Sequence, residues 1–460
     1  MNFMKFKTLI LVFLLMLAGI YASAEDEYVV KLKRPAQMLS LPDENTKDCY
    51  VTGSWDDVQQ YLEADVVEYY EPVMYARYLG TPNWQVLSTN GTFAEKLGVQ
   101  GCNVKVAVID GGMNAYEAIS SRVLEGYDFY EKTTDVTDEN GHGTFVASMI
   151  ALEGSAFACE SYIVPLKVFY AITDLNGNYV YDDNGNKQYT AKSSDVARAI
   201  RAAVDTYGCD VINLSLSFYS APLTVKEAVN YAIDKGAIVV AAAGNDGNST
   251  YHYPAAFPNV TGVGSSDSND EVAFFSQRND SVHVVAPGQS VIVSPRVGVN
   301  NIGSGTSFSA PQVSALAAVA RCINPEITNA EFMELLKTTS VHPDDIDPND
   351  NIYTYDVNYG YGIIDCRAFI KKMIDDRDAF ISPIKVKNGQ AYSLVYNNTE
   401  ADLTAKGIIV TGDNVIEITD LFIEYDNVQP LSGDYTEGEV KHMVWDGFTK
   451  LVPLSPVSVK

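Results

Sequence analysis

Three short segments of the chain each hold a side chain that can take part in acyl transfer. Asp110 ends an apolar run and is followed by two glycines, His142 lies between two glycines, and Ser307 precedes a predicted helix over 312–323. An imidazole can remove the proton of a serine hydroxyl as that hydroxyl attacks a carbonyl, and a carboxylate can hold the imidazole in the required tautomer. The three residue types therefore predict nucleophilic catalysis if the fold brings them together.

A fourth segment supplies a hydrogen-bond donor. Asn245 follows the apolar stretch 237–244, and an Asn side-chain amide can donate to an oxyanion as its charge develops. Ser307, at the start of a helix, would also lie where backbone N–H groups favour negative charge. Both features suit a reaction whose intermediate carries a negatively charged oxygen.

Each segment alone also fits an ordinary structural role. Asp110 could simply be one of the acidic residues that end many parallel strands. His142 could be a loop or core histidine, and Ser307 could be a helix N-cap. These roles would all have to coincide, in one chain and in this order, to account for the whole pattern. We therefore favour the catalytic interpretation.

The elements that must position these residues alternate between strands and helices. Nearly continuous apolar runs, typical of buried parallel strands, occupy 104–109, 211–214 and 237–241. Helical periodicity lies between them at 195–205 and 225–235. This alternation predicts a doubly wound α/β domain with a mainly parallel sheet, whose sites lie at the carboxyl ends of the strands, where Asp110 and Asn245 stand.

Taken together, the four segments resemble the motifs of the subtilisin-like serine proteases (subtilases, peptidase S8 family) over roughly residues 84–375. The resemblance implies that Asp110 is the orienting acid, His142 the general base and Ser307 the nucleophile. It makes Asn245 the oxyanion-hole side chain, acting with the backbone N–H of Ser307. The chain order Asp, His, Ser is known from the family and does not follow from the spacing.

The resemblance also implies a surface for a peptide substrate. It assigns a binding edge to Ser215, Leu216 and Ser217, and the wall of the pocket for the residue before the cut to Ala242, Ala243 and Gly244. An extended peptide adds to such an edge as a strand. The pocket base falls in 249–254, and relatives often have a small residue where His252 stands and Gly where Ser217 stands. We therefore expect a narrowed pocket that holds an imidazole beside Asp246.

The regions outside the α/β domain divide the chain into further parts. A basic start, the apolar run 9–20 and Ala-Ser-Ala before residue 25 predict a secretory signal peptide over 1–24, with a membrane anchor as the alternative. Residues 25–78 read as a small α+β unit, with strands at 28–32 and 66–70 and a helix at 56–62. That unit resembles the inhibitory propeptide of the family, which the enzyme itself removes, here near 75–79.

The remaining boundaries follow from composition. The catalytic domain is expected over 79–375, and short alternating runs predict a β-sandwich accessory domain over 380–460. Its segment 439–454 is similar to the closing strand of small β-domains in secreted proteins of anaerobic Gram-positive bacteria. We expect Trp445 and Phe448 there to serve packing rather than carbohydrate binding.

The net charge excludes some partners. Lys and Arg number 32 against 59 Asp and Glu, which gives −27. Nucleic acid and anionic lipid both require basic surface, so neither is expected as a partner. No second apolar run of spanning length follows the signal, and no membrane anchor is expected. The predicted product is a secreted, extracellular monomer from a Gram-positive bacterium.

Cysteines and metals are less well defined by the sequence. No Cys-x-x-Cys or zinc-type spacing occurs among the six cysteines. Cys49 would leave with the propeptide, and by position along the resembling fold we expect Cys102 paired with Cys159 and Cys322 with Cys366, leaving Cys209 free.

Metal binding is not fixed by the sequence either. Catalysis of this kind requires no cofactor. Structural calcium is common in the family, and an acidic chain is compatible with it, but its ligands are unknown. The stretch 174–189 reads as an incomplete EF-hand-like loop or as a surface β-hairpin.

The resulting prediction is a secreted serine endopeptidase that acts on protein or peptide substrates. Its own propeptide is the expected intramolecular inhibitor. One alternative is a catalytically inactive subtilase that serves as a binding module, against which the four intact residues count. Another is a different acyl hydrolase such as an esterase, against which the missing Gly-x-Ser-x-Gly motif and the peptide-binding edge count.

Overall fold

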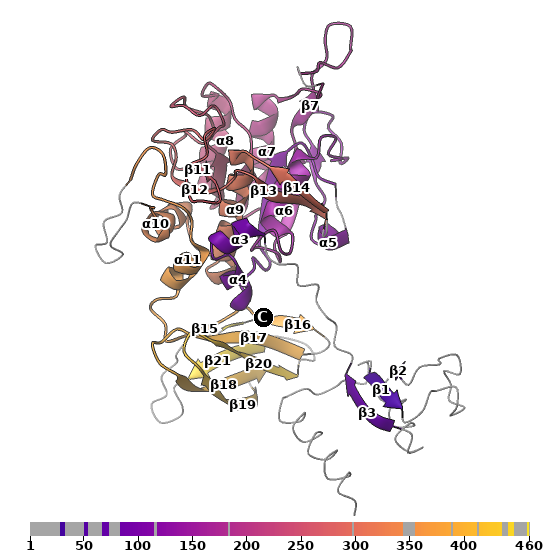
Figure 1. The fold of residues 1–460 in the computed structure, drawn as a ribbon, viewed down its shortest axis with the longest axis vertical. Coiled ribbons are helices and arrows are strands. Elements are labelled where there is room, and N and C mark those ends of the chain that lie inside the picture. The colour runs from indigo at the N-terminus through magenta and orange to yellow at the C-terminus, as the bar shows by residue number, and fades with distance from the viewer. Residues whose placement is uncertain are drawn as a thin grey trace, which may run out of the picture. The chain divides into compact units, whose positions relative to one another are not determined.

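A computed structural model describes the chain in segments (Figure 1). The described residues are 28–32, 50–53, 67–72, 83–114, 117–182, 185–296, 299–343, 355–387, 390–411, 414–434, 440–445 and 458–459. The chain divides into two compact units, residues 1–79 and 80–460, and each is considered by itself. The expected signal peptide, the helix at 56–62 and the maturation region at 75–79 lie outside the described residues.

The first unit contains three antiparallel strands in its described part. They are β1 (Tyr28–Leu32), β2 (Tyr50–Gly53) and β3 (Val67–Pro72), in the order β2-β1-β3. Val30 of β1 lies opposite Val51 on one side and Tyr70 on the other. The strands predicted at 28–32 and 66–70 are therefore present.

The second unit is built on a sheet of seven strands, and every neighbouring pair in it is parallel. In spatial order the strands are β12 (Val284–Pro287), β11 (Thr261–Ser266), β10 (Ile238–Ala242), β9 (Val211–Leu214), β4 (Lys105–Asp110), β6 (Tyr162–Lys167) and β5 (Tyr127–Asp128). The three apolar runs of the sequence form β4, β9 and β10, whose residues are almost all buried. The predicted doubly wound parallel sheet is confirmed.

Helices cover both faces of this sheet (Figure 1). On one face, α6 (His142–Ala151) and α9 (Thr306–Ile323) share a hydrophobic core with Val106 and Val108 of β4. On the other face, α7 (Ser193–Asp205) and α8 (Leu223–Asp234) pack with Ala107 and Ile109 of the same strand. Alternate side chains of one strand thus enter opposite cores, as expected for a strand buried on both faces.

Further helices and two hairpins complete the α/β part of the second unit. The helices are α3 (Trp84–Ser88), α4 (Thr92–Lys96), α5 (Glu117–Ser120), α10 (Asn329–Thr339) and α11 (Cys366–Met373). The two hairpins are β7 (Phe169–Ala171) with β8 (Tyr189–Ala191), and β13 (Val291–Arg296) with β14 (Val299–Gly303). Within the described residues, no helix combines the length and apolar character needed to cross a membrane.

The C-terminal region consists of strands in two antiparallel sheets. One contains β15 (Ala379–Ile381), β16 (Lys385–Lys387), β17 (Gln390–Asn397) and β20 (Val428–Asp434). The other contains β18 (Leu403–Thr411), β19 (Asn414–Ile423), β21 (Val440–Trp445) and β22 (Ser458–Val459). Val395 of the first sheet and Ile409 of the second belong to one buried apolar cluster, so the two sheets share a core.

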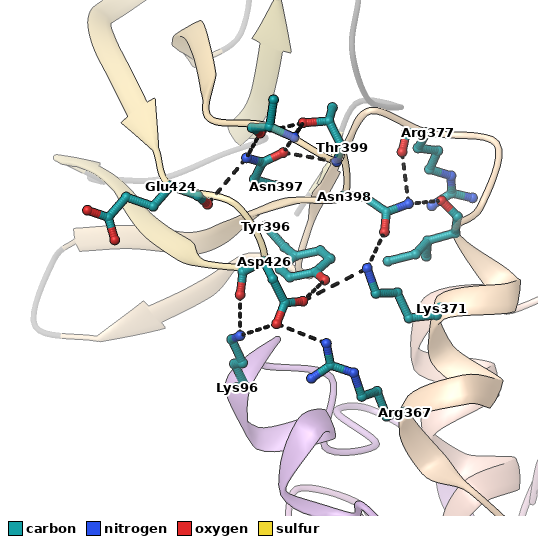
Figure 2. A network of polar contacts seen from close by, with 12 residues as sticks. Lys96, Arg367, Lys371, Arg377, Tyr396, Asn397, Asn398, Thr399, Glu424 and Asp426 are labelled. Carbon is teal, nitrogen blue, oxygen red and sulfur yellow. Dashed lines mark hydrogen bonds and ion pairs between the residues drawn. The ribbon is translucent and has the colours of Figure 1, made fainter.

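A polar network joins this β region to helices α4 and α11 of the α/β part (Figure 2). Asp426, in the turn between β19 and β20, lies 2.9 Å from the Arg367 guanidinium, 3.4 Å from Lys96 Nζ and 3.9 Å from Lys371 Nζ. The Tyr396 hydroxyl donates a hydrogen bond to the same carboxylate. Burial by itself would raise the pKa of Asp426, but these hydrogen bonds and positive charges lower it to about 2.

Candidate active site

The first two site residues meet at the carboxyl end of β4. Asp110 is the last residue of β4, and His142 is the first residue of α6. His142 Nδ1 lies 2.8 Å from Asp110 Oδ1, which also accepts a hydrogen bond of 2.7 Å from the Gly111 N–H. The Asp110 side chain is 1% exposed, whereas the His142 side chain is 33% exposed. The buried carboxylate thus holds one edge of an imidazole that is only partly exposed to solvent.

Glycines allow these two elements to approach. A Cβ on Gly143 would lie 2.2 Å from the Gly112 carbonyl oxygen and 3.2 Å from the Asp110 Cβ. Gly112 itself has φ +107°, and a Cβ there would lie 2.2 Å from the Val136 carbonyl oxygen. Neither position accepts a larger residue without displacing backbone, so the glycines beside Asp110 and His142 are required for their contact.

Asp138 supports His142 from the preceding loop, and the sequence analysis missed it. Its carboxylate accepts hydrogen bonds from the Gly141 N–H at 3.0 Å, the Thr144 N–H at 2.8 Å and the Thr144 hydroxyl at 2.7 Å. These bonds satisfy N–H groups at the start of α6. An acidic residue just before a glycine-rich helix start was the sequence signal for this role.

The surroundings of His142 favour its charged form. Burial alone would lower the pKa of His142, but the charge and hydrogen bond of Asp110 and the charge of Asp138 outweigh that effect. The pKa of His142 is therefore raised above its usual 6.5. Such an environment stabilises the imidazolium that forms when this ring accepts a proton.

Asn245 and Ser307 are brought together at the N-terminus of α9. The helix begins at Thr306, earlier than the predicted start at 312, so Ser307 lies in its first turn. The Thr306 N–H and the Thr306 hydroxyl each donate a hydrogen bond of 2.9 Å to Asn245 Oδ1. With its oxygen held in this way, the exposed Asn245 amide keeps its Nδ2 hydrogens for another acceptor. Thr306 is a second positioning residue that the sequence analysis did not identify.

A buried chain of hydrogen bonds fixes the first turn of α9 to the end of β9. The Ser215 hydroxyl donates to the Ser307 carbonyl at 2.9 Å and accepts from Asn213 Nδ2 at 3.0 Å. The Ser314 hydroxyl in turn donates to Asn213 Oδ1 at 2.9 Å. The His142 ring lies 5.8 Å from the ring of Phe308, the residue after Ser307. The four candidate catalytic residues therefore occupy the same edge of the sheet.

The residues expected to form the pocket also lie together. His252 is buried, with Nε2 2.9 Å from Asp246 Oδ2 and Nδ1 3.0 Å from the Ser217 hydroxyl. Its ring lies against Gly244, where a Cβ would be 2.7 Å from His252 Cγ. Tyr219, also missed from the sequence, places its ring 4.9 Å from the imidazole. The remaining members of the expected wall and edge, Leu216, Ala242 and Ala243, are buried.

The expected cysteine pairing is wrong. Cys102 Sγ lies 2.9 Å from Cys322 Sγ, not beside Cys159, because the turn that carries Cys102 packs on the C-terminal end of α9. The Cys159 thiol instead donates to the Ala156 carbonyl at 3.1 Å. None of the described cysteines is in a disulfide, and Cys366 is fully buried.

In its described residues, the stretch 174–189 forms a hairpin, as one of the two interpretations of the sequence predicts. Asp174 accepts hydrogen bonds from the backbone of Asn176 and Asn178 and from the Asn178 amide. Asp182 accepts the equivalent bonds from Asn186. These carboxylates thus close their own turns, and no cluster of three or more His, Cys, Asp or Glu suited to a metal occurs in the described parts of the chain.

Comparison with known proteins identifies the family. The model of the Subtilase family matches residues 101–362. The thermophilic serine proteinase of Bacillus sp. (strain AK1) is 36% identical over 263 residues, which cover 55% of this chain and 63% of that protein. Subtilisin BL of Lederbergia lenta is 33% identical over 257 residues, which cover 56% of this chain and 90% of that protein. The resemblance inferred from the motifs is confirmed: the chain belongs to the subtilase family of serine endopeptidases.

Two further comparisons describe the extent of the likeness. The minor extracellular protease Epr of Bacillus subtilis (strain 168) is 29% identical over 353 residues, which cover 76% of this chain and 50% of that protein. The chain thus spans less than two thirds of the length of Epr and of the AK1 proteinase. Among solved structures, a cold adapted subtilisin-like serine proteinase matches with 27% identity and a TM-score of 0.48, over 58% of this chain and 90% of that one.

Proposed function

We propose that this subtilase hydrolyses peptide bonds through an acyl-enzyme intermediate, with Ser307 as nucleophile, His142 as general base and Asp110 as the orienting acid. The observation that carries the proposal is the hydrogen bond of 2.8 Å between the buried Asp110 and His142, at the sheet edge where the first turn of α9 presents Ser307. A carboxylate that accepts from Nδ1 leaves Nε2 unprotonated and able to accept the proton of a serine hydroxyl.

In the first half of the reaction, the Ser307 hydroxyl attacks the substrate carbonyl as His142 Nε2 takes its proton. The carbonyl oxygen becomes an oxyanion, which accepts hydrogen bonds from Asn245 Nδ2 and the Ser307 N–H. His142 then gives its proton to the departing amine, and an ester to Ser307 remains. Water completes the cycle in the same way, with His142 as base and then as acid. No step requires a cofactor, and structural calcium remains a proposal without named ligands.

Substrate is bound as an extended strand along Ser215, Leu216 and Ser217, with the residue before the cut directed toward Gly244. The imidazole of His252, held by Asp246 and Ser217, occupies the base of that pocket. A filled pocket favours small residues, because a larger ring would have to displace a side chain that makes two hydrogen bonds. Peptides that differ only in the residue before the cut test this: faster cleavage after Ala than after Phe is expected, and equal rates would contradict it.

The proposed maturation and destination of the chain follow from the N-terminal sequence. Residues 1–24 direct export, and residues 25–78 inhibit the catalytic domain until the enzyme removes them. The mature product acts as an extracellular bacterial monomer on proteins or peptides, with neither nucleic acid nor a membrane anchor involved. The region 380–460 serves as an accessory domain, which in the described residues is attached through Asp426.

A serine-directed fluorophosphonate tests the nucleophile. We expect one covalent adduct, on the tryptic peptide that contains Ser307, and none in the Ser307→Ala variant. The Asn245→Ala variant is the matched control, because it keeps the nucleophile and should still be labelled. Absence of labelling in the parent protein would favour the inactive binding module. Labelling without cleavage of any protein, but with cleavage of short esters, would favour the esterase.

A further inference from the structure

Two cysteines that are distant in sequence meet behind the catalytic helix. Cys102 lies in the turn just before β4, and Cys322 lies in the last turn of α9, with their sulfurs 2.9 Å apart. Cys322 is 9% exposed, and Cys102 is partly exposed. The two residues are 220 positions apart, so the contact depends on the fold and not on proximity in the sequence.

The backbone around these cysteines holds them in place independently of the sulfur contact. Gly101 has φ +78°, and a Cβ there would lie 3.3 Å from the Ala318 Cβ on α9 and 3.2 Å from the Ser161 Cβ. The turn therefore packs closely on α9, one helical turn before Cys322. The Val104 N–H donates to the Gly101 carbonyl at 3.1 Å and closes the turn. Because both attachment points are fixed by packing, the two thiols remain within reach of each other.

We propose that Cys102 and Cys322 form a disulfide when the folded chain meets an external disulfide. In the first step, the Cys102 thiolate attacks that disulfide, which forms a mixed disulfide and releases one thiolate. The Cys322 thiolate then attacks the Cys102 sulfur, which closes the Cys102–Cys322 bond and releases the second thiolate. Two electrons pass to the external disulfide, and the two protons of the cysteines end on the two thiols it becomes.

The acidity and the accessibility of the two thiols indicate which one attacks the external disulfide first. The hydrogen bond from Cys322 lowers the pKa of Cys102, whereas the same contact and burial raise the pKa of Cys322. Cys102 is thus the more accessible sulfur and the better source of thiolate. The oxidising surroundings rest on the proposed export of the chain, but the pairing itself rests only on the geometry.

The loop closed by this disulfide would contain all the proposed catalytic residues. All seven strands of the central sheet lie between Cys102 and Cys322, and so do Asp110, His142 and Ser307. A cross-link over so long a loop restricts the unfolded chain, and we expect the oxidised protein to unfold about 5–10 °C above the reduced protein. A protease exposed to its own activity benefits directly, because transient unfolding is what admits cleavage.

Peptide mapping tests the pairing without reliance on activity. The full chain carrying Ser307→Ala is equilibrated with oxidised glutathione, its free thiols are alkylated, and it is digested with trypsin without reduction. Each of the six cysteines falls on a different tryptic peptide. We expect the peptides 97–105 and 322–337 to be joined, and Cys209 to be alkylated. Alkylated Cys102, or Cys102 joined to any other cysteine, would overturn the proposal.

Thermal unfolding supplies the second readout. In the protein that keeps all its cysteines, the unfolding temperature should be about 5–10 °C higher in the oxidised form than in the reduced form. In the Cys102→Ser variant this difference should vanish, whereas Cys209→Ser, a buried cysteine outside the pair, should retain it. Equal unfolding temperatures of the oxidised and reduced protein with the joined peptides present would overturn the stabilising role. Neither peptide mapping nor thermal unfolding requires proteolytic activity, so both tests of the disulfide stand even if the proposed function is wrong.

Discussion

The contacts of Asp426 hold the C-terminal β region to α4 and α11, so we expect that replacement of this one carboxylate weakens that attachment. Asp426 is the only acidic side chain among the twelve residues in Figure 2 that faces Lys96, Arg367 and Lys371 together. Asp426→Asn keeps the shape but removes the charge. Lowering the pKa from 3.8 to about 2 corresponds to about 2 kcal/mol of stability at neutral pH. We expect the variant to lose about that amount.

The pH dependence of this loss has a definite sign. The folded state lowers the pKa of Asp426, so its contribution is fully present above pH 3.8 and disappears as the pH falls toward about 2. The parent and the Asn variant should therefore differ most at neutral pH and converge in acid. Unfolding followed by circular dichroism, in a Ser307→Ala background that prevents self-digestion, measures the difference at each pH.

A matched control separates this network from ordinary surface charge. Asp375 pairs with Lys372 at 2.7 Å, but both side chains are more than half exposed. An exposed pair contributes little, so Asp375→Asn should change stability by less than about 0.5 kcal/mol. Equal effects of the two substitutions at neutral pH, or an Asp426→Asn effect that persists unchanged at pH 2, would show that the charge of Asp426 does not stabilise the folded protein.

Three predictions concern catalysis and are measured by steady-state kinetics on peptides. Asn245→Ala removes the proposed oxyanion donor and should lower kcat about 10²–10³-fold with little change in KM; an effect confined to KM would contradict that role. Protonation of His142 should lower kcat/KM about tenfold per pH unit below the pKa of this residue. The charge of Asp138 helps to raise that pKa, so Asp138→Asn should move the acid limb of the pH profile to lower pH. An acid limb that does not move, or that moves to higher pH, would contradict this. His252→Gly empties the proposed pocket base and should raise cleavage after Phe relative to Ala at least about tenfold; an unchanged ratio would show that His252 does not limit the pocket.

Much of the site could be predicted because its chemistry restricts residue types. The glycines beside Asp110 and His142 are part of the sequence motifs, and the distances at Gly112 and Gly143 show that they allow a close approach of two backbones. The expected neighbourhood of His252 and Asp246 is confirmed by their contact of 2.9 Å. The buried strands were equally predictable, since short continuous apolar runs are typical of strands buried on both faces.

The features that sequence analysis missed depend on contacts between distant segments. Thr306 orients the Asn245 amide across a gap of 61 positions, which no local pattern reports. The predicted helix over 312–323 starts just after Pro311, whereas α9 begins at Thr306 and contains this proline. Pro311 has no N–H to donate to the Ser307 carbonyl, but the Ser215 hydroxyl donates to it instead. The cysteine partners were assigned by position along the resembling fold, whereas the packing of the turn before β4 on α9 decides which sulfurs meet.

The most direct test of the proposed function is the intact mass and N-terminal sequence of the exported protein, with the parent beside Ser307→Ala. If Ser307 carries out the maturation, only the parent loses the residues up to about 78, whereas the variant retains 25–78. Loss of that segment from both proteins would show that another protease matures the chain. Its retention in both would contradict a self-maturing endopeptidase that uses Ser307.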